Sequence, residues 1–288
     1  MTSTPLNARM PQALAQTLRE RLGHVYFQRH LLREFLVRDL VARYIGTIMG
    51  FFWSVIHPLI LLLVYTMVFG IIIPPPQLER LAQRGWDGEV VGFAFYIFCG
   101  LLPWYAFQES LVRTTTSIAD HAHLIKQVRF PAKILPVYIT LSSLVNQLIG
   151  TAIFLLFQLA VLGSIPVTLA ALPLVLFFQF LFFLGLGLLF STMNTYVRDV
   201  APLVSIGTMI LMWTTPMLYT LEIVPEPIRP ILYANPVTYL VLLHHEVMLF
   251  GEWPSLALWS AFGFISLAAF VFGYAVFTRC HAEFADLL

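Results

Sequence analysis

Hydrophobic residues run along this chain in long blocks that few charges interrupt. The longest covers residues 134–197, contains no Asp, Glu, Lys or Arg, and is broken only by the turn-forming sequence Gly163-Ser164-Ile165-Pro166. A helix needs about 20 residues to cross the hydrocarbon core of a bilayer, so this block predicts two spans joined by a tight hairpin. Similar blocks cover residues 50–73, 91–112, 200–221 and 254–277. The pattern therefore predicts an all-α, polytopic membrane protein with six transmembrane helices.

Residues 31–45 show a different pattern, in which apolar side chains recur every three or four positions and charged side chains fill the gaps. This spacing predicts an amphipathic helix, with Glu34 before Arg38 and Asp39 before Arg43 as pairs one turn apart. We interpret it as an interfacial helix on the cytoplasmic leaflet. The alternative is a solvated helix of a small cytoplasmic domain. The interfacial interpretation is favoured because no other cytoplasmic segment is large enough to supply a partner surface.

Residues 222–253 are irregular, because several prolines interrupt them and their apolar run over residues 237–243 is too short to cross a bilayer. We expect re-entrant or outer-interface helices here, between the fifth and sixth spans. The domain organisation that follows is a cytoplasmic lead over residues 1–30, one permease domain over residues 31–280, and a cytoplasmic tail over residues 281–288.

Composition excludes a large soluble core, because 59% of the residues are hydrophobic, only 11% are charged, and the mean hydropathy is +0.83. The cations are distributed unevenly. Of the 16 Lys and Arg residues, only Arg80, Arg84 and Arg229 fall in connections that follow an odd-numbered span. By the positive-inside rule, both termini lie in the cytoplasm. The location that we expect is the inner membrane of a bacterium.

The sequence contains few candidates for catalytic, metal-binding or nucleotide-binding residues. Its only lysines, Lys126 and Lys133, follow Ile and Ala, so no phosphate-binding Gly-Lys-Ser/Thr loop exists. The adjacent His244, His245 and Glu246 point to different helix faces, and we expect no metal site there. The spans carry almost no ionisable side chains, which disfavours an ion-coupled carrier, and no cluster of carboxylates or histidines suggests a membrane-embedded transferase. We expect no catalytic residue and no nucleic-acid partner, and infer that a separate ATPase supplies energy.

The connection over residues 114–136 is the candidate docking element for that ATPase. Its centre can form a short amphipathic helix that stops before Pro131, with Ile118, Leu124, Ile125 and Val128 as apolar anchors. An ordinary solvated connector is the alternative. The candidate coupling residues are Ser117, Asp120, Leu124, Ile125, Lys126 and Arg129.

Several motifs together resemble one family. The sequence over residues 37–58, the run Cys99-Gly-Leu-Leu-Pro-Trp104 and the run over residues 124–131 are similar to the membrane subunits of bacterial polysaccharide ABC exporters. These type-2 permeases move lipid-linked O-antigen, capsule or teichoic acid chains. The chain departs from the family pattern at His57, which stands for the usual Asn, and at His245, which stands for the usual Arg and puts an anion contact there in doubt.

The resemblance implies a homodimer in membrane lipid with two copies of a nucleotide-binding subunit, which would carry ATP and Mg²⁺. It also implies that residues 117–130 form the coupling helix and that residues 31–45 frame the cytoplasmic gate. The expected substrate is a lipid-linked, O-antigen-like glycan. Capsular polysaccharide, teichoic acid, lipid or small-molecule efflux are the alternatives.

Aromatic residues are abundant in and near the predicted first two spans. Sugars stack on aromatic faces, so an aromatic-rich, nearly uncharged route could pass a polymer without holding any repeat tightly. The carrier diphosphate would favour Arg38 and Arg43 near the inner interface, through bidentate pairing. The candidate conduit residues are Phe51, Phe52, Trp53, Tyr65, Phe93, Tyr96, Trp104 and Tyr105.

Overall fold

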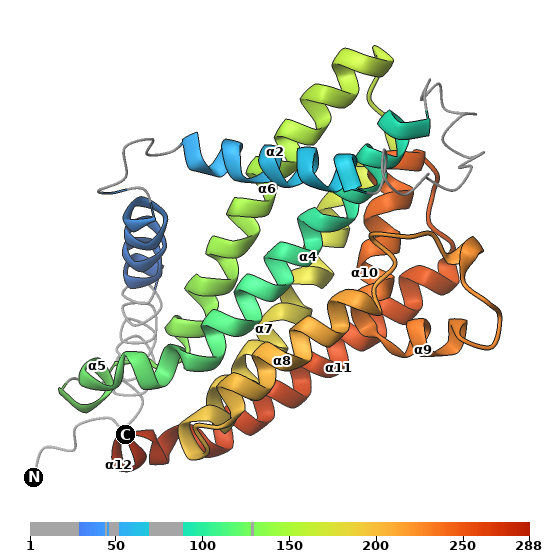
Figure 1. The fold of residues 1–288 in the computed structure, drawn as a ribbon. Coiled ribbons are helices and arrows are strands. Elements are labelled where there is room, and N and C mark those ends of the chain that lie inside the picture. The colour runs from blue at the N-terminus through green and yellow to red at the C-terminus, as the bar shows by residue number, and fades with distance from the viewer. Residues whose placement is uncertain (1–28, 44, 46–51, 69–88, 128–129) are drawn as a thin grey trace, which may run out of the picture.

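The fold is a bundle of long helices. In this computed structural model, which describes residues 29–43, 45, 52–68, 89–127 and 130–288, no residue is in a strand. Among these described residues, four helices are long and apolar enough to cross a membrane: α4 (Glu89–Asp120), α6 (Ile134–Leu162), α7 (Leu172–Tyr196) and α11 (Leu256–Cys280). They run side by side in Figure 1 and confirm the predicted second, third, fourth and sixth spans.

The predicted hairpin between α6 and α7 is present. Gly163 ends α6 in the left-handed conformation, with φ of 67°, and its N–H donates to the carbonyl of Leu159. Glycine suits this position because it has no Cβ to clash in that region of backbone space. Pro166 then precedes a 3₁₀ turn, η4 (Val167–Ala171), that leads directly into α7. The turn chemistry is therefore as the sequence indicates.

Two of the predicted spans are short in the described structure. α2 (Trp53–Thr66) and α8 (Val200–Trp213) each have 14 residues, or about 21 Å of helix, against the ~30 Å of a hydrocarbon core. α8 ends three residues before Pro216, because a proline disfavours a helical conformation at the residue before it. α2 crosses α4 and α6 at an angle (Figure 1). The expected count of six spans is not confirmed.

Residues 221–253 form short helices, as expected: η5 (Leu221–Ile223), α9 (Arg229–Ala234), α10 (Pro236–His244) and η6 (His245–Phe250). Asn235 organises them, because its side chain accepts the N–H of Val237 at 2.9 Å and donates to Thr215 at 2.9 Å. α10 and η6 pack inside the bundle, where Val241 and Val247 are fully buried. Their re-entrance from a membrane surface stays a prediction.

α7 and α11 pack backbone to backbone. Gly185 and Gly273 face one another so closely that a Cβ on Gly273 would lie 1.9 Å from the carbonyl oxygen of Gly185. Small residues permit this approach, as in many membrane helix pairs. The two helices therefore form a tightly joined unit.

The predicted amphipathic helix is present over residues 29–42, and part of its apolar face packs against protein. Phe35 contacts Tyr138 and Phe130, with ring centroids 5.4 and 5.6 Å apart. Leu31 and Leu32 pack against the same cluster at the start of α6. The first turns of α6, a predicted span, therefore supply part of a partner surface, and the position of this helix at the membrane interface stays a prediction. Val37 and Val41 remain half exposed.

Candidate functional site

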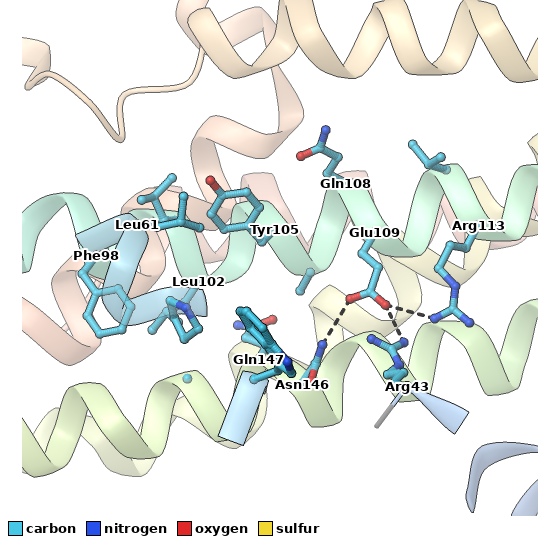
Figure 2. A pocket seen from close by; sticks show the side chains of 16 residues that line it. Arg43, Leu61, Phe98, Leu102, Tyr105, Gln108, Glu109, Arg113, Asn146 and Gln147 are labelled. Atoms are coloured by element: carbon cyan, nitrogen blue, oxygen red, sulfur yellow. Dashed lines mark hydrogen bonds and ion pairs between the residues drawn. The ribbon is translucent and has the colours of Figure 1, made fainter. Parts of the chain in front are cut away.

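A pocket lies between α2, α4 and α6, with Arg43 at its edge. Its volume is about 600 Å³. One end is lined by apolar side chains such as Leu61, Phe98 and Leu102, and the other by charged and amide side chains such as Glu109 and Asn146 (Figure 2). A pocket with one apolar end and one polar end suits an amphiphile, whose chain and head group need different surroundings.

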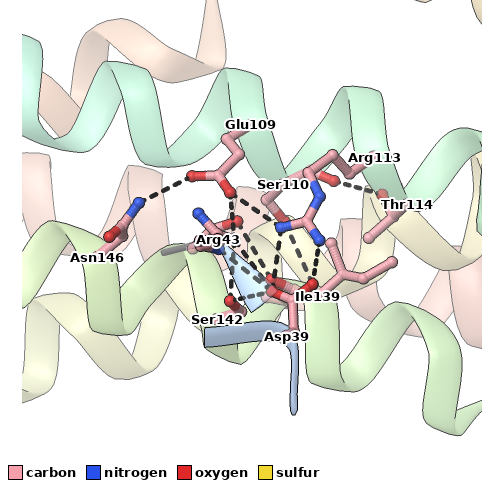
Figure 3. Close-up of polar contacts among 11 residues, drawn as sticks. Asp39, Arg43, Glu109, Ser110, Arg113, Thr114, Ile139, Ser142 and Asn146 are labelled. Carbon is pink, nitrogen blue, oxygen red and sulfur yellow. Dashed lines mark hydrogen bonds and ion pairs between the residues drawn. The ribbon is translucent and has the colours of Figure 1, made fainter. Parts of the chain in front are cut away.

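Four charged side chains close the polar end of the pocket. Arg43, at the end of the helix over residues 29–42, pairs with Asp39 at 3.2 Å and also with Glu109 of α4. Arg113, one turn after Glu109, pairs with it at 3.0 Å and also with Asp39 (Figure 3). Each arginine therefore bridges both carboxylates. This reciprocal pairing fixes the amphipathic helix against α4.

α6 completes the cluster with neutral groups. The hydroxyl of Ser142 donates to Asp39 and accepts from Arg43 at 2.9 Å, and Asn146 donates to Glu109 at 3.5 Å. Burial by itself raises the pKa of Asp39. Hydrogen bonds from Arg113 and Ser142, together with the charges of both arginines, lower this pKa by more than burial raises it. The pKa of Asp39 therefore lies below its ordinary value, and the carboxylate stays ionised at neutral pH.

The cluster limits how the two arginines that were predicted to bind the diphosphate could reach it. Arg43 is already neutralised by Asp39 and Glu109, so an anion could reach it only by replacing one of those carboxylates. Arg38 lies on the exposed side of its helix. The sequence predicted the local pair of Asp39 with Arg43. It gave no signal for the pairing between helices, which depends on tertiary packing.

The predicted conduit aromatics lie in different surroundings. Trp53 and Tyr105 line the pocket. Phe52 is exposed and is absent from the pocket lining, Phe51 lies outside the described residues, and the side chain of Tyr65 is not among those described. The other three are buried in the core of the chain: Phe93, Tyr96 and Trp104.

Tyr96 holds the segment after α8 in place. Its hydroxyl contacts the carbonyl oxygens of Pro216 at 3.0 Å and Tyr219 at 3.1 Å, and its ring stacks on His245 with centroids 4.1 Å apart. The Nε2–H of His245 in turn donates to the carbonyl of Tyr96 at 2.9 Å. These contacts give Tyr96 a structural role inside one chain. The prediction that it lines a conduit is untested.

Amide side chains connect the long helices. Gln147 of α6 pairs with Gln179 of α7 and donates to Nε2 of His244 at 3.0 Å. The opposite ring nitrogen of His244 donates to the carbonyl of Leu240 at 2.9 Å, which fixes a neutral tautomer. Gln158 donates to the carbonyl of Met248 at 3.0 Å. Because Gln147 also lines the pocket, this network forms part of the pocket wall.

The predicted coupling segment folds as two helices. α4 continues to Asp120, and α5 (Ala122–Gln127) follows after one residue. Asp120 and Lys126 are exposed, Leu124 is partly buried, and Ser117 is buried. Ile125 packs against two interior clusters. Arg129 and Val128 lie outside the described residues.

Ile118 is not available as an apolar anchor for a partner. Its side chain is fully buried in a cluster with Leu184, Leu188 and Phe277. The expectation that it contacts another subunit is therefore wrong, because its position on α4 turns it toward α7 and α11. The surface that remains on α5 is mostly polar.

The sequence profile of the family described as ABC-2 type transporter matches residues 30–249. An O-antigen export system permease protein of Klebsiella pneumoniae is 27% identical over 255 residues, which cover 87% of this chain and 92% of that protein. The protein of the same name from Myxococcus xanthus is 28% identical over 265 residues, 91% of this chain and 96% of that protein. These matches confirm the resemblance found in the sequence.

Proposed function

Because the chain belongs to the ABC-2 type transporter family, we propose that it is the membrane subunit of an ATP-driven exporter of lipid-linked, O-antigen-like polysaccharide. The names of its relatives in two bacteria support this substrate class. The observation in the structure that supports it best is the pocket between α2, α4 and α6, which combines an apolar end with a polar one.

Energy would come from a partner. Two copies of a nucleotide-binding subunit, carrying ATP and Mg²⁺, would serve a homodimer of this chain. We place their contact at α5 and the end of α4, where Asp120 and Lys126 are exposed. Leu124 is the best remaining apolar contact, because it is only partly buried. Ile125 and Ser117 would act from inside the fold.

The topology that we propose has six crossings of the bacterial inner membrane and both termini in the cytoplasm. The four long helices account for four of these crossings. α2 and α8, extended by the residues that follow them, would supply the other two. The predominance of Lys and Arg at the predicted cytoplasmic end supports the orientation.

The pocket would receive the lipid carrier on its way into the transport route. Its apolar end would hold part of the lipid chain, and Trp53 and Tyr105 would present aromatic faces to the first sugars. Arg38 would meet the diphosphate at the exposed side of the helix over residues 29–42. Arg43 would bind the diphosphate only if the diphosphate displaced Asp39 or Glu109 from it.

The test is export by variants of the two pocket aromatics. Tyr105→Ala combined with Trp53→Ala should reduce surface polysaccharide per folded membrane subunit about 30-fold, since two lost stacking contacts, each worth on the order of 1 kcal/mol, together cost about 2 kcal/mol. Tyr105→Phe, which keeps the ring, should export normally. The matched control is Phe264→Ala, because Phe264 is exposed and does not line the pocket. Normal export by the double variant would contradict the assigned route.

A further inference from the structure

The last eight residues fold back onto the bundle. After α11 the chain makes a 3₁₀ turn, η7 (His281–Glu283), and a short helix, α12 (Phe284–Leu287). The sequence predicted only a cytoplasmic tail here. Phe284 is fully buried, although its neighbours on both sides are exposed. A side chain buried this completely shows that the tail is packed and not merely attached.

Phe284 occupies the point where several helices meet. Its ring packs edge-on against Phe277 of α11, with centroids 5.5 Å apart. The same cluster contains Ile118 from α4 and Leu188 from α7, and Ile125 of α5 packs against it. α12 also contacts α5 directly, and the two lie at the same end of the molecule (Figure 1). One aromatic side chain therefore joins α5 to three long helices.

A second contact holds the turn before α12. The hydroxyl of Tyr196, at the end of α7, donates to the carboxylate of Glu283. The Nδ1–H of His281 donates to the carbonyl of Thr278 at 2.8 Å, which continues the end of α11. The tail is thus attached to α7 and α11 by polar contacts at the surface and by Phe284 in the interior.

We propose that residues 281–288 hold α5 in position for energy coupling and that Phe284 is the positioning residue. The proposal rests on the proposed function, since it assumes that an ATPase contacts α5. A helix of six residues does not keep its shape or place without tertiary contacts. With Phe284 in place, a displacement of α5 moves α4, α7 and α11 together. Without it, α5 moves independently and ATP hydrolysis is uncoupled from transport.

The experiment uses the complete complex of membrane subunit and ATPase in lipid nanodiscs and in cells. Phe284→Ala should lower the glycan exported per ATP hydrolysed about fivefold or more, the range of a typical coupling free energy. Phe284→Leu, which keeps an apolar side chain in the cluster, should recover most of the coupling. The matched control is Leu287→Ala, because Leu287 lies on the same short helix and is exposed.

A variant that leaves the bulk of the cluster intact separates coupling from folding. Tyr196→Phe removes only the hydroxyl that holds Glu283, and should lower the same ratio by a smaller factor while the complex elutes and melts normally. Unchanged export per ATP in both Phe284→Ala and Tyr196→Phe would overturn the proposal. If the unmodified chain itself neither bound the ATPase nor exported glycan, the proposed function would fail instead.

Discussion

A single added methyl group tests how closely α7 and α11 are packed. An alanine at Gly273 would place its Cβ 1.9 Å from the carbonyl oxygen of Gly185 and 2.8 Å from the carbonyl carbon. Carbon atoms in contact normally lie about 3.5–4.0 Å from their neighbours. The obstructing atoms belong to the backbone, so no side chain can rotate away. The two helices must therefore separate by roughly 1 Å or more, and contacts along their whole interface weaken.

The expected cost of Gly273→Ala is about 1–3 kcal/mol or more, the usual range for overpacking. Higher helix propensity returns up to about 1 kcal/mol. The net loss should appear as a lower thermal midpoint of the detergent-solubilised protein, followed by size-exclusion chromatography after heating. The control is Gly263→Ala on the same helix, whose added Cβ would meet Phe178 at 3.5 Å, an ordinary contact. This variant should melt at or above the original temperature. Equal midpoints for the two variants would refute the described packing.

Two further predictions concern polar contacts. The pKa of Asp39 is lowered in the folded chain, so its contribution to stability is complete above its ordinary pKa of 3.8 and is lost as the pH falls through the lower folded value. The difference in thermal midpoint between the unmodified chain and Asp39→Asn should therefore be constant at neutral pH and shrink below pH 3.8; a difference that grows would contradict this sign. Asn235→Ala should destabilise the protein by about 1–2 kcal/mol, because α10 loses its N-cap and Thr215 loses its donor. Asn235→Asp should keep the cap. Equal melting of the unmodified chain and both variants would disprove the role of Asn235.

The sequence predicted the long helices well because hydrophobic length alone determines them. A block without charges can satisfy its backbone in lipid only as a helix or as part of a closed barrel, and its length sets the number of crossings. The Gly163 turn followed from local backbone chemistry in the same way. Features that depend on a single helix and its ends could therefore be predicted from the sequence.

Features that depend on contacts between helices could not be predicted from the sequence. Asp39 and Arg113 are far apart in the sequence, and neither position signals that the two side chains pair. Trp104 and Tyr105 are adjacent aromatic residues, yet one is fully buried in the core and the other lines the pocket. The rotation of α4 about its own axis determines which of the two side chains is buried. A helix that is apolar on all sides gives little indication of this rotation in its sequence. The burial of Phe284 was missed for the same reason.

Reconstituted transport tests the central claim most directly. The chain would be co-purified with its proposed nucleotide-binding partner, placed in liposomes, and supplied with lipid-linked glycan on the ATPase side. The account predicts that the glycan reaches the opposite leaflet only when ATP and Mg²⁺ are present, and that the ATPase alone moves none. Glycan transfer by this chain without the ATPase and ATP, or no transfer by the complete, ATP-hydrolysing complex, would contradict it.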